Sequence, residues 1–230
     1  MDRYTLYYLL TFIAFIATFG AQMYIRHIYS KYSKIDCVNM MNGANVASKI
    51  LMSNNLRVNV NRANGYLSDH YDPINKMVTL SEYNYSNSSI SAVSVSAHEC
   101  GHALQDDSGY TFLKIRSMMF PIVRFSSYTG YIAISVGLMF SILNLVLIGI
   151  LLEMIILLFQ IVTLPVEFDA SSRALKQLEI NNILNEEELK DAKKVLRAAA
   201  LTYVAGVAST LIEILRLLLI ISTRSSRRRD

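Results

Sequence analysis

Residues 88–102 read Ser-Ser-Ile-Ser-Ala-Val-Ser-Val-Ser-Ala-His-Glu-Cys-Gly-His. Ser88 and Ser89 are favourable N-caps, and the small and apolar residues after them are compatible with a buried helix. On such a helix His98 and His102 point to the same face, because four residues make roughly one turn. The stretch therefore predicts a helix that presents two imidazoles side by side.

Two imidazoles on one helix face can bind one metal ion, and zinc suits them. Zinc accepts imidazole nitrogen readily and tolerates three protein ligands with a fourth position open to water. Glu99 can then take a proton from that water, which is the chemistry of the H-E-x-x-H metallopeptidase pattern. The alternative is a chance match, or two histidines that only pack in a helix. Since the chain has four histidines in all, a pair at ligand spacing favours the metal site.

The composition predicts a membrane protein. Hydrophobic residues make up 53% of the 230-residue chain. Four stretches are long enough to cross a bilayer at about 20 residues each: residues 4–25, two crossings within residues 120–166 with a turn near residues 141–144, and residues 198–221. The first stretch could instead be a cleaved signal peptide, but its n-region is short and it has no clear cleavage site. We therefore expect a retained anchor.

The chain is predicted to divide into six consecutive segments. They are a transmembrane anchor (4–25), a catalytic region with a small sheet and the metal helix (26–119), a transmembrane hairpin (120–166), a helical segment with the third metal ligand (167–197), a transmembrane or re-entrant helix (198–221) and a basic tail (222–230). Cys37 and Cys100 form no recognisable disulfide framework, so we expect free thiols.

Local patterns predict further elements in the polar segments. Val46, Ile50 and Leu51 predict a short amphipathic helix over residues 45–54. Asn185, with Glu188 three residues later, predicts the capped start of another helix.

Alternating apolar residues before the metal helix predict a small antiparallel sheet. Its strands would cover residues 56–60, 66–71 and 76–80, with turns at residues 64–65 and 72–73. We expect residues 76–80 to form an edge strand that holds an extended substrate by backbone pairing. A covered strand in a structural sheet is the alternative.

Two histidines leave zinc one protein ligand short. His27 and His70 could supply it, but a downstream carboxylate is the usual source, and Glu167 is the best candidate. It closely follows Pro165, which favours a helix start. The alternative is an ordinary charge at a helix N-terminus. If His102 and Glu167 bind one ion, the chain between them crosses the membrane an even number of times, as a hairpin would.

Charges near the span ends predict which side of the membrane holds the metal helix. Lysine and arginine are more numerous on that side than on the opposite side, which predicts a cytoplasmic active site. If the fourth crossing is complete, the arginines of the tail lie on the opposite side from the metal helix, which conflicts with this distribution. Residues 198–221, which contain Glu213 and Arg216, could therefore be re-entrant. Glu153 falls inside the third span, where a carboxylate is costly unless it is protonated or faces the bundle interior.

Taken together, these motifs resemble the YugP-like family of bacterial membrane-bound neutral zinc metallopeptidases, which is similar in plan to HtpX-type membrane proteases. The resemblance rests on residues 69–73, 97–105, 159–171 and 198–204. It implies that His98, His102 and Glu167 bind one zinc ion per chain and that Glu99 is the catalytic base.

One position departs from the pattern of the HtpX-type enzymes. Glu167 and Ala170 match their E-x-x-A motif, but Ser171 stands where they usually carry an aspartate. A donor for the oxyanion is also expected, and four residues could supply it: His70, Tyr71, Arg173 and Tyr203.

We therefore expect a mainly α membrane protein with about four transmembrane helices and a small α+β zincin-like catalytic region. Its expected function is that of a membrane-embedded zinc metalloendopeptidase, in which Glu99 assists attack of zinc-bound water on a peptide bond. The expected partners are a polypeptide substrate, membrane proteins included, and the lipid bilayer, with no nucleic acid. The sequence leaves the oligomeric state open.

The expected location is the cell membrane, with several crossings and a cytoplasmic active site. The alternatives are a noncatalytic zinc-stabilised membrane scaffold and a transporter component. Glu99 argues against the scaffold, and the placement of most charges outside the spans argues against the transporter.

Overall fold

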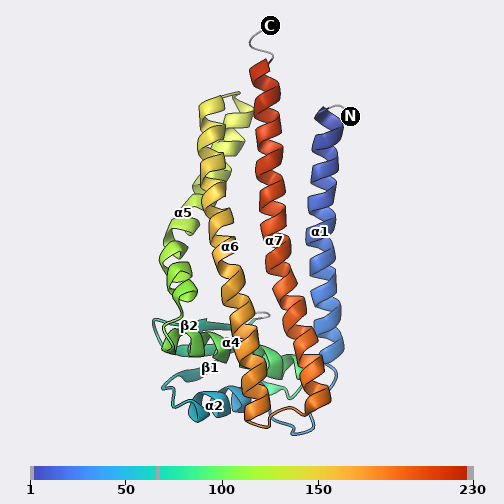
Figure 1. Ribbon diagram of the computed structural model, residues 1–230, viewed down its shortest axis with the longest axis vertical. Helices are drawn as coiled ribbons and strands as arrows, with labels where there is room; N and C mark the ends of the chain where they lie inside the picture. The colour runs from blue at the N-terminus through green and yellow to red at the C-terminus, as the bar shows by residue number, and fades with distance from the viewer. Residues whose placement is uncertain (1–2, 66–67, 227–230) are drawn as a thin grey trace. The chain divides into compact units, whose positions relative to one another are not determined.

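The computed structural model describes residues 3–65 and 68–226, and these residues are mainly helical (Figure 1). The elements follow in this order: α1 (Arg3–Tyr32), α2 (Gly43–Ser53), β1 (Asn59–Ala63), β2 (His70–Asp72), β3 (Met77–Ser81), α3 (Glu82–Ser86), α4 (Ile90–Asp107), α5 (Thr111–Met139), α6 (Leu143–Ile180) and α7 (Glu186–Ser226). A mainly α chain with a small sheet is the fold class that the sequence predicts.

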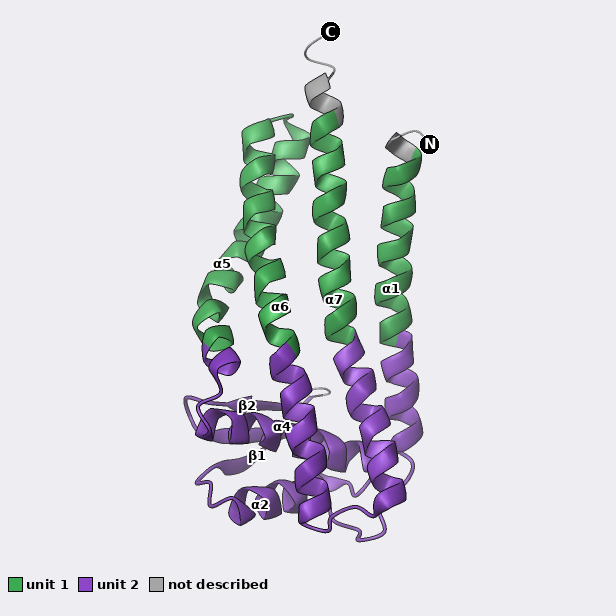
Figure 2. Ribbon diagram, viewed as in Figure 1, with its two compact units in different colours: residues 1–22, 115–164, 202–230 green, residues 23–114, 165–201 purple. Residues whose placement is uncertain are grey.

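The chain forms two compact units, coloured separately in Figure 2. Unit 1 consists of Met1–Gln22, Ile115–Leu164 and Thr202–Asp230, and unit 2 consists of Met23–Lys114 and Pro165–Leu201. Unit 1 is built from long apolar helices. Unit 2 contains the sheet, the short helices and the H-E-x-x-H stretch.

Three helices among the described residues are long and apolar enough to cross a membrane: Thr5–Tyr32, Leu143–Ile180 and Glu186–Ser222. The expected fourth crossing, within α5, is helical but does not reach the same hydropathy. Arg124 and the polar run at residues 126–130 lower it. The helix α7 is uninterrupted, which favours a complete crossing over a re-entrant one. The tail residues 227–230 lie outside the described part of the chain.

In unit 1, α5 and α6 approach closely because glycines stand at their contact. A Cβ atom on Gly137 would lie 2.7 Å from Val146 Cγ2, and one on Gly149 would lie 2.4 Å from Ile134 Cγ1. Small residues at such contacts are typical of helices that pack in membranes. Ser141, with a φ of 57°, lies between the two helices, as the turn predicted near residues 141–144 requires.

The expectation of a helix start at Pro165 is wrong. The helix α6 runs without a break from Leu143 to Ile180, with Pro165 inside it. An internal proline removes one backbone hydrogen bond and costs about 3 kcal/mol. The residues that follow, Val166, Ala170 and Ala174, are fully buried, and their packing offsets that cost.

The sheet differs from the prediction in two ways. Its strand order is β1-β3-β2, with β1 parallel to β3 and β2 antiparallel to β3. It is therefore mixed rather than antiparallel, and residues 77–80 of the expected edge strand lie in the central strand, with residue 76 in the turn before it. The physical reason is burial: Val78 and Leu80 of β3 are fully buried, whereas β1 and β2 are more exposed. Residues 66–67 of the expected second strand lie outside the described residues.

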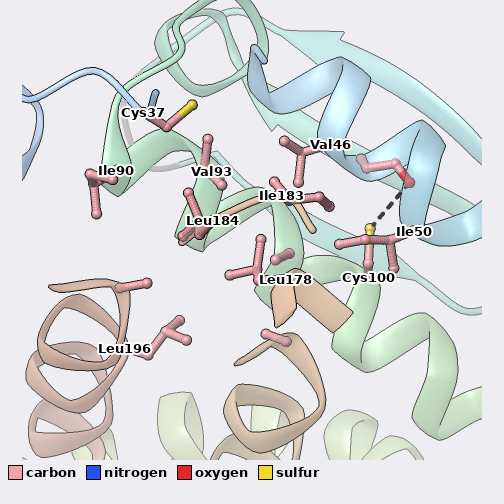
Figure 3. Packing of buried hydrophobic residues seen from close by; sticks show 14 of the residues in the cluster. Cys37, Val46, Ile50, Ile90, Val93, Cys100, Leu178, Ile183, Leu184 and Leu196 are labelled. Atoms are coloured by element: carbon pink, nitrogen blue, oxygen red, sulfur yellow. Dashed lines mark hydrogen bonds between the residues drawn. The ribbon is translucent and has the colours of Figure 1, made fainter. Parts of the chain in front are cut away.

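The core of unit 2 surrounds α4 (Figure 3). Val46 and Ile50 of α2 pack against it on one side, which confirms the short amphipathic helix predicted over residues 45–54. Leu178 of α6 belongs to the same cluster. Cys100, in the middle of α4, is fully buried and donates from Sγ to the carbonyl of Ala47 at 3.7 Å. The histidine-bearing helix is thus held rigidly on several sides.

Side-chain caps fix where two helices of unit 2 begin. Ser89 Oγ accepts a hydrogen bond from the backbone N–H of Ala92 at the start of α4. At the start of α7, Asn185 Oδ1 accepts from the N–H of Glu188 at 3.0 Å, and Glu188 Oε2 accepts from the N–H of Asn185 at 2.8 Å. Both caps confirm the predictions. Cys37 and Cys100 are buried free thiols, also as predicted.

Candidate metal centre

The candidate site lies where α4 meets α6 inside unit 2. A Cβ atom on Gly101 would lie only 2.4 Å from the carbonyl oxygen of Ala170, so the two backbones are in direct contact at these residues. His98 and His102 flank Gly101 on α4, and Glu167 lies one turn before Ala170 on α6. The glycine therefore lets the two helices come close enough for these three side chains to meet.

The three side chains converge on one point. His98 Nε2 lies 3.2 Å from Glu167 Oε2, and His102 Nε2 lies 3.8 Å from Glu167 Oε1. The candidate ligand atoms all lie within 4.8 Å of one another. Glu167 is 2% exposed and His102 is 7% exposed, so the cluster is largely shielded from solvent. The sequence predicted this grouping, whereas His27 and His70, the other candidates for the third ligand, do not belong to it.

The surroundings of the two imidazoles fit a metal ion. The Nδ1 atom of His102 faces Gln105 Oε1 at 3.0 Å, and that of His98 faces Ser171 Oγ at 3.2 Å. Each ring is thus anchored through Nδ1 while its Nε2 points toward the carboxylate. Two imidazole nitrogens and one carboxylate form a donor set that zinc prefers when a further position stays open. Partners at the far nitrogen are the usual support of metal-bound histidines.

A family model described as "Putative neutral zinc metallopeptidase" matches residues 7–222. The chain belongs to this family. It is 42% identical over 216 residues to a Bacillus subtilis protein named "Putative membrane protease YugP", a match that covers 94% of this chain and 96% of the relative. No solved structure gives a significant match. The family predicted from the sequence motifs is therefore confirmed.

In this member of the metallopeptidase family, Glu99 lies beside the ligand cluster and is 7% exposed. Burial raises the pKa of its carboxyl group to about 7, and the nearby charge of Glu167 acts in the same direction. The charges of His98 and His70 oppose this shift. A carboxyl group with a pKa near neutrality can both accept and release a proton, as general acid–base chemistry requires.

Sequence reasoning missed two residues that support the site, Gln105 and Asp169, and it gave Arg173 a different role, that of a candidate oxyanion donor. Gln105 contacts His102 and also donates to Asp169 Oδ2 at 2.8 Å. Arg173 in turn donates from Nε to Asp169 Oδ2 at 2.6 Å. Two spacings could have suggested them: Gln105 lies three residues after His102, and Asp169 and Arg173 form an i, i+4 pair of opposite charges.

The candidate oxyanion donors in unit 2 have different surroundings. Tyr71 donates to Asp106 Oδ2 at 2.7 Å, and burial together with this hydrogen bond raises the pKa of Tyr71. Arg173 is paired with Asp169. His70 lies exposed on the edge strand β2, with Nδ1 at 2.8 Å from the carbonyl of Ser68, and its charge acts on Glu99. Tyr71 and Arg173 each donate a hydrogen bond to a carboxylate, whereas the hydrogen bond described for His70 is to a backbone carbonyl.

Proposed function

We propose that this chain is a membrane-bound zinc metalloendopeptidase in which His98, His102 and Glu167 bind one zinc ion and Glu99 is the general base. One observation carries the proposal. Two helices of a zinc metallopeptidase family member bring two imidazoles and a carboxylate within 4.8 Å of one another, although His98 and Glu167 are 69 positions apart in the sequence. A structural salt bridge would need one histidine, whereas both here direct Nε2 at the same carboxylate.

The chemistry divides between the metal and the protein. Zinc held by His98, His102 and Glu167 would lower the pKa of its water and polarise the carbonyl of the peptide bond. Glu99 accepts the proton of the attacking water and passes it to the departing amine. Its burial keeps the carboxyl group away from bulk water, so the proton is held beside the reacting atoms. Gln105 and Ser171 orient the imidazoles through their Nδ1 atoms.

The proposed substrate is a polypeptide, and membrane proteins are included because the chain itself is membrane-bound. Three helices suited to crossing a bilayer support this location, as does the name of the Bacillus subtilis relative.

Metal removal tests the proposal. The purified chain should contain one zinc ion per polypeptide and cleave an unstructured polypeptide such as casein. A chelator should abolish cleavage, and zinc should restore it. Cleavage that continues in zinc-free protein would contradict the proposal.

We further propose that the protein crosses the membrane several times with unit 2 on the cytoplasmic side, as the lysine and arginine distribution favours. Cysteine labelling tests this well, since both native thiols are buried and should react slowly. Ser108→Cys should be protected from an impermeant reagent in intact cells, and Asn144→Cys should react. Both positions are exposed on the protein surface. Labelling of both would contradict the proposed topology.

A further inference from the structure

The two candidate histidine ligands are anchored by different chemical groups. His98 Nδ1 faces the hydroxyl of Ser171, and His102 Nδ1 faces the side-chain amide of Gln105. A hydroxyl can either donate or accept, so Ser171 does not select one tautomer of His98. An amide oxygen can only accept. Whether Gln105 selects one tautomer of His102 therefore depends on whether its Oε1 or its Nε2 faces the ring.

The orientation of the Gln105 amide is fixed by its other contacts. Its Nε2 donates to the carbonyl of Val166 at 2.8 Å and to Asp169 Oδ2 at 2.8 Å. Both amide hydrogens are thus used, and a flipped amide would place Oε1 against two acceptors. Oε1 must face His102 and accept a hydrogen bond from Nδ1–H. Proton and lone pair are on opposite nitrogens of a neutral imidazole, so Nε2 of His102 keeps its lone pair for a metal.

A charged pair holds this amide in place. Arg173 Nε donates to Asp169 Oδ2 at 2.6 Å, and Arg173 Nη1 donates to Ser108 Oγ and to the carbonyl of Leu104. Gln105 itself is fully buried. Asp169 and Arg173 are partly exposed. Charge-assisted hydrogen bonds are stronger than neutral ones, and linked hydrogen bonds polarise one another. The Asp169 carboxylate therefore makes Gln105 Oε1 a better acceptor for His102.

We propose that Gln105, supported by Asp169 and Arg173, is a positioning residue that fixes the tautomer and orientation of His102 for zinc. The inference deepens the proposed function and rests on it for the identity of the metal. The tautomer of His102 can also be measured in the metal-free chain, so this part of the inference does not depend on the identity of the metal. Gln105 is not a ligand and touches no substrate; it acts through His102.

Zinc affinity is the first test, measured by competition with a chromophoric chelator. Gln105→Leu should weaken zinc binding by between about 10- and 100-fold, the range found when groups behind metal ligands are removed. Asp169→Asn keeps an acceptor for Gln105 but removes the charge, so it should have a smaller effect. Ser171→Ala should also have a smaller effect, because Ser171 leaves the His98 tautomer unselected.

A matched control is available on α6. Gln177 accepts a hydrogen bond from Asn54 Nδ2 at 2.9 Å and so makes an amide link between α6 and the C-cap of α2, away from the cluster. Gln177→Leu should lower thermal stability and leave zinc affinity unchanged. A loss of zinc affinity after Gln105→Leu that merely equals the loss after Gln177→Leu would overturn the proposal.

The second test is the tautomer, read from ¹⁵N chemical shifts of the imidazoles in zinc-free protein and assigned with a His102→Gln variant. Wild type should show His102 with hydrogen on Nδ1, and Gln105→Leu should show a mixture. If Gln105→Leu does not fold, the smaller loss of zinc affinity in Asp169→Asn and the wild-type tautomer remain as the two readouts. A wild-type His102 with hydrogen on Nε2 would overturn the proposal. Failure of the proposed function would look different, since wild type would then bind no zinc while the His102 tautomer remained as expected.

Discussion

The helix α6 makes two glycine-dependent contacts, one in each unit, and they serve different ends. In unit 2 it meets α4 at Gly101, where the backbone oxygen of Ala170 fills the space of a Cβ atom. In unit 1 it meets α5, where Gly149 accommodates the side chain of Ile134. The first contact is surrounded by imidazoles, carboxylates and an amide, and the second by apolar side chains. Glycines thus allow helices to approach closely in both units, and the residues beside each contact determine whether a reactive site forms there.

The largest effect is expected where the α4–α6 contact brings ligands together. Glu167→Ala should reduce zinc affinity by more than about 100-fold, because removal of a ligand exceeds the effect of removing a supporting group. Glu179→Ala, the same change at an exposed position of the same helix, should leave zinc affinity unchanged. Zinc content and chelator competition measure both. Stoichiometric zinc in a folded Glu167→Ala protein would show that Glu167 is not a ligand.

A smaller effect is expected from forcing α4 and α6 apart. The added Cβ of Gly101→Ala would clash with the backbone of Ala170, which has no rotamer through which to yield. We expect a loss of about 2–3 kcal/mol in the free energy of unfolding, within the range for overpacked cores. Zinc affinity should fall as well, because the imidazoles move away from Glu167. Thermal unfolding and zinc titration of one preparation measure the two effects, and unchanged zinc affinity would argue against this role of the contact.

The smallest effect is expected at the α5–α6 contact. The added Cβ of Gly149→Ala would clash with the side chain of Ile134 but would lie 3.1 Å and 3.2 Å from the nearest backbone atoms, farther than the Cβ of Gly101→Ala lies from the backbone of Ala170. Alanine also favours helix more than glycine does, which offsets part of the cost. We expect a net loss of about 1 kcal/mol or less, with zinc affinity unchanged. Thermal unfolding in detergent, with and without zinc, measures it. A fall in zinc affinity as large as that of Gly101→Ala would show that the α4–α6 and α5–α6 contacts do not differ in their effect on zinc binding.

The sequence predicts the candidate site better than the sheet because the two depend on different information. The spacing of His98 and His102 places both on one helix face whatever surrounds the helix. The chemistry of zinc then restricts the third group to a few residues, of which Glu167 is one. Gln105 was missed because its role depends on contacts with α6 that no local pattern shows.

The errors in the fold have a common physical origin. Alternation along residues 56–80 reveals the two faces of each strand but not which strands pair, so the parallel β1–β3 pairing was missed. Pro165 predicts a helix boundary from local preference, and burial of the residues after it overrides that preference. In both cases tertiary packing decides.

The most direct test of the central claim compares wild type with Glu99→Gln. This change keeps the shape of the side chain and removes its ability to accept a proton, and Glu99 does not belong to the candidate ligand cluster. Zinc content and cleavage of an unstructured polypeptide should be measured on the same preparations. We expect one zinc ion per chain in both proteins, with cleavage by Glu99→Gln reduced by at least about 100-fold. Equal cleavage by the two proteins would contradict it.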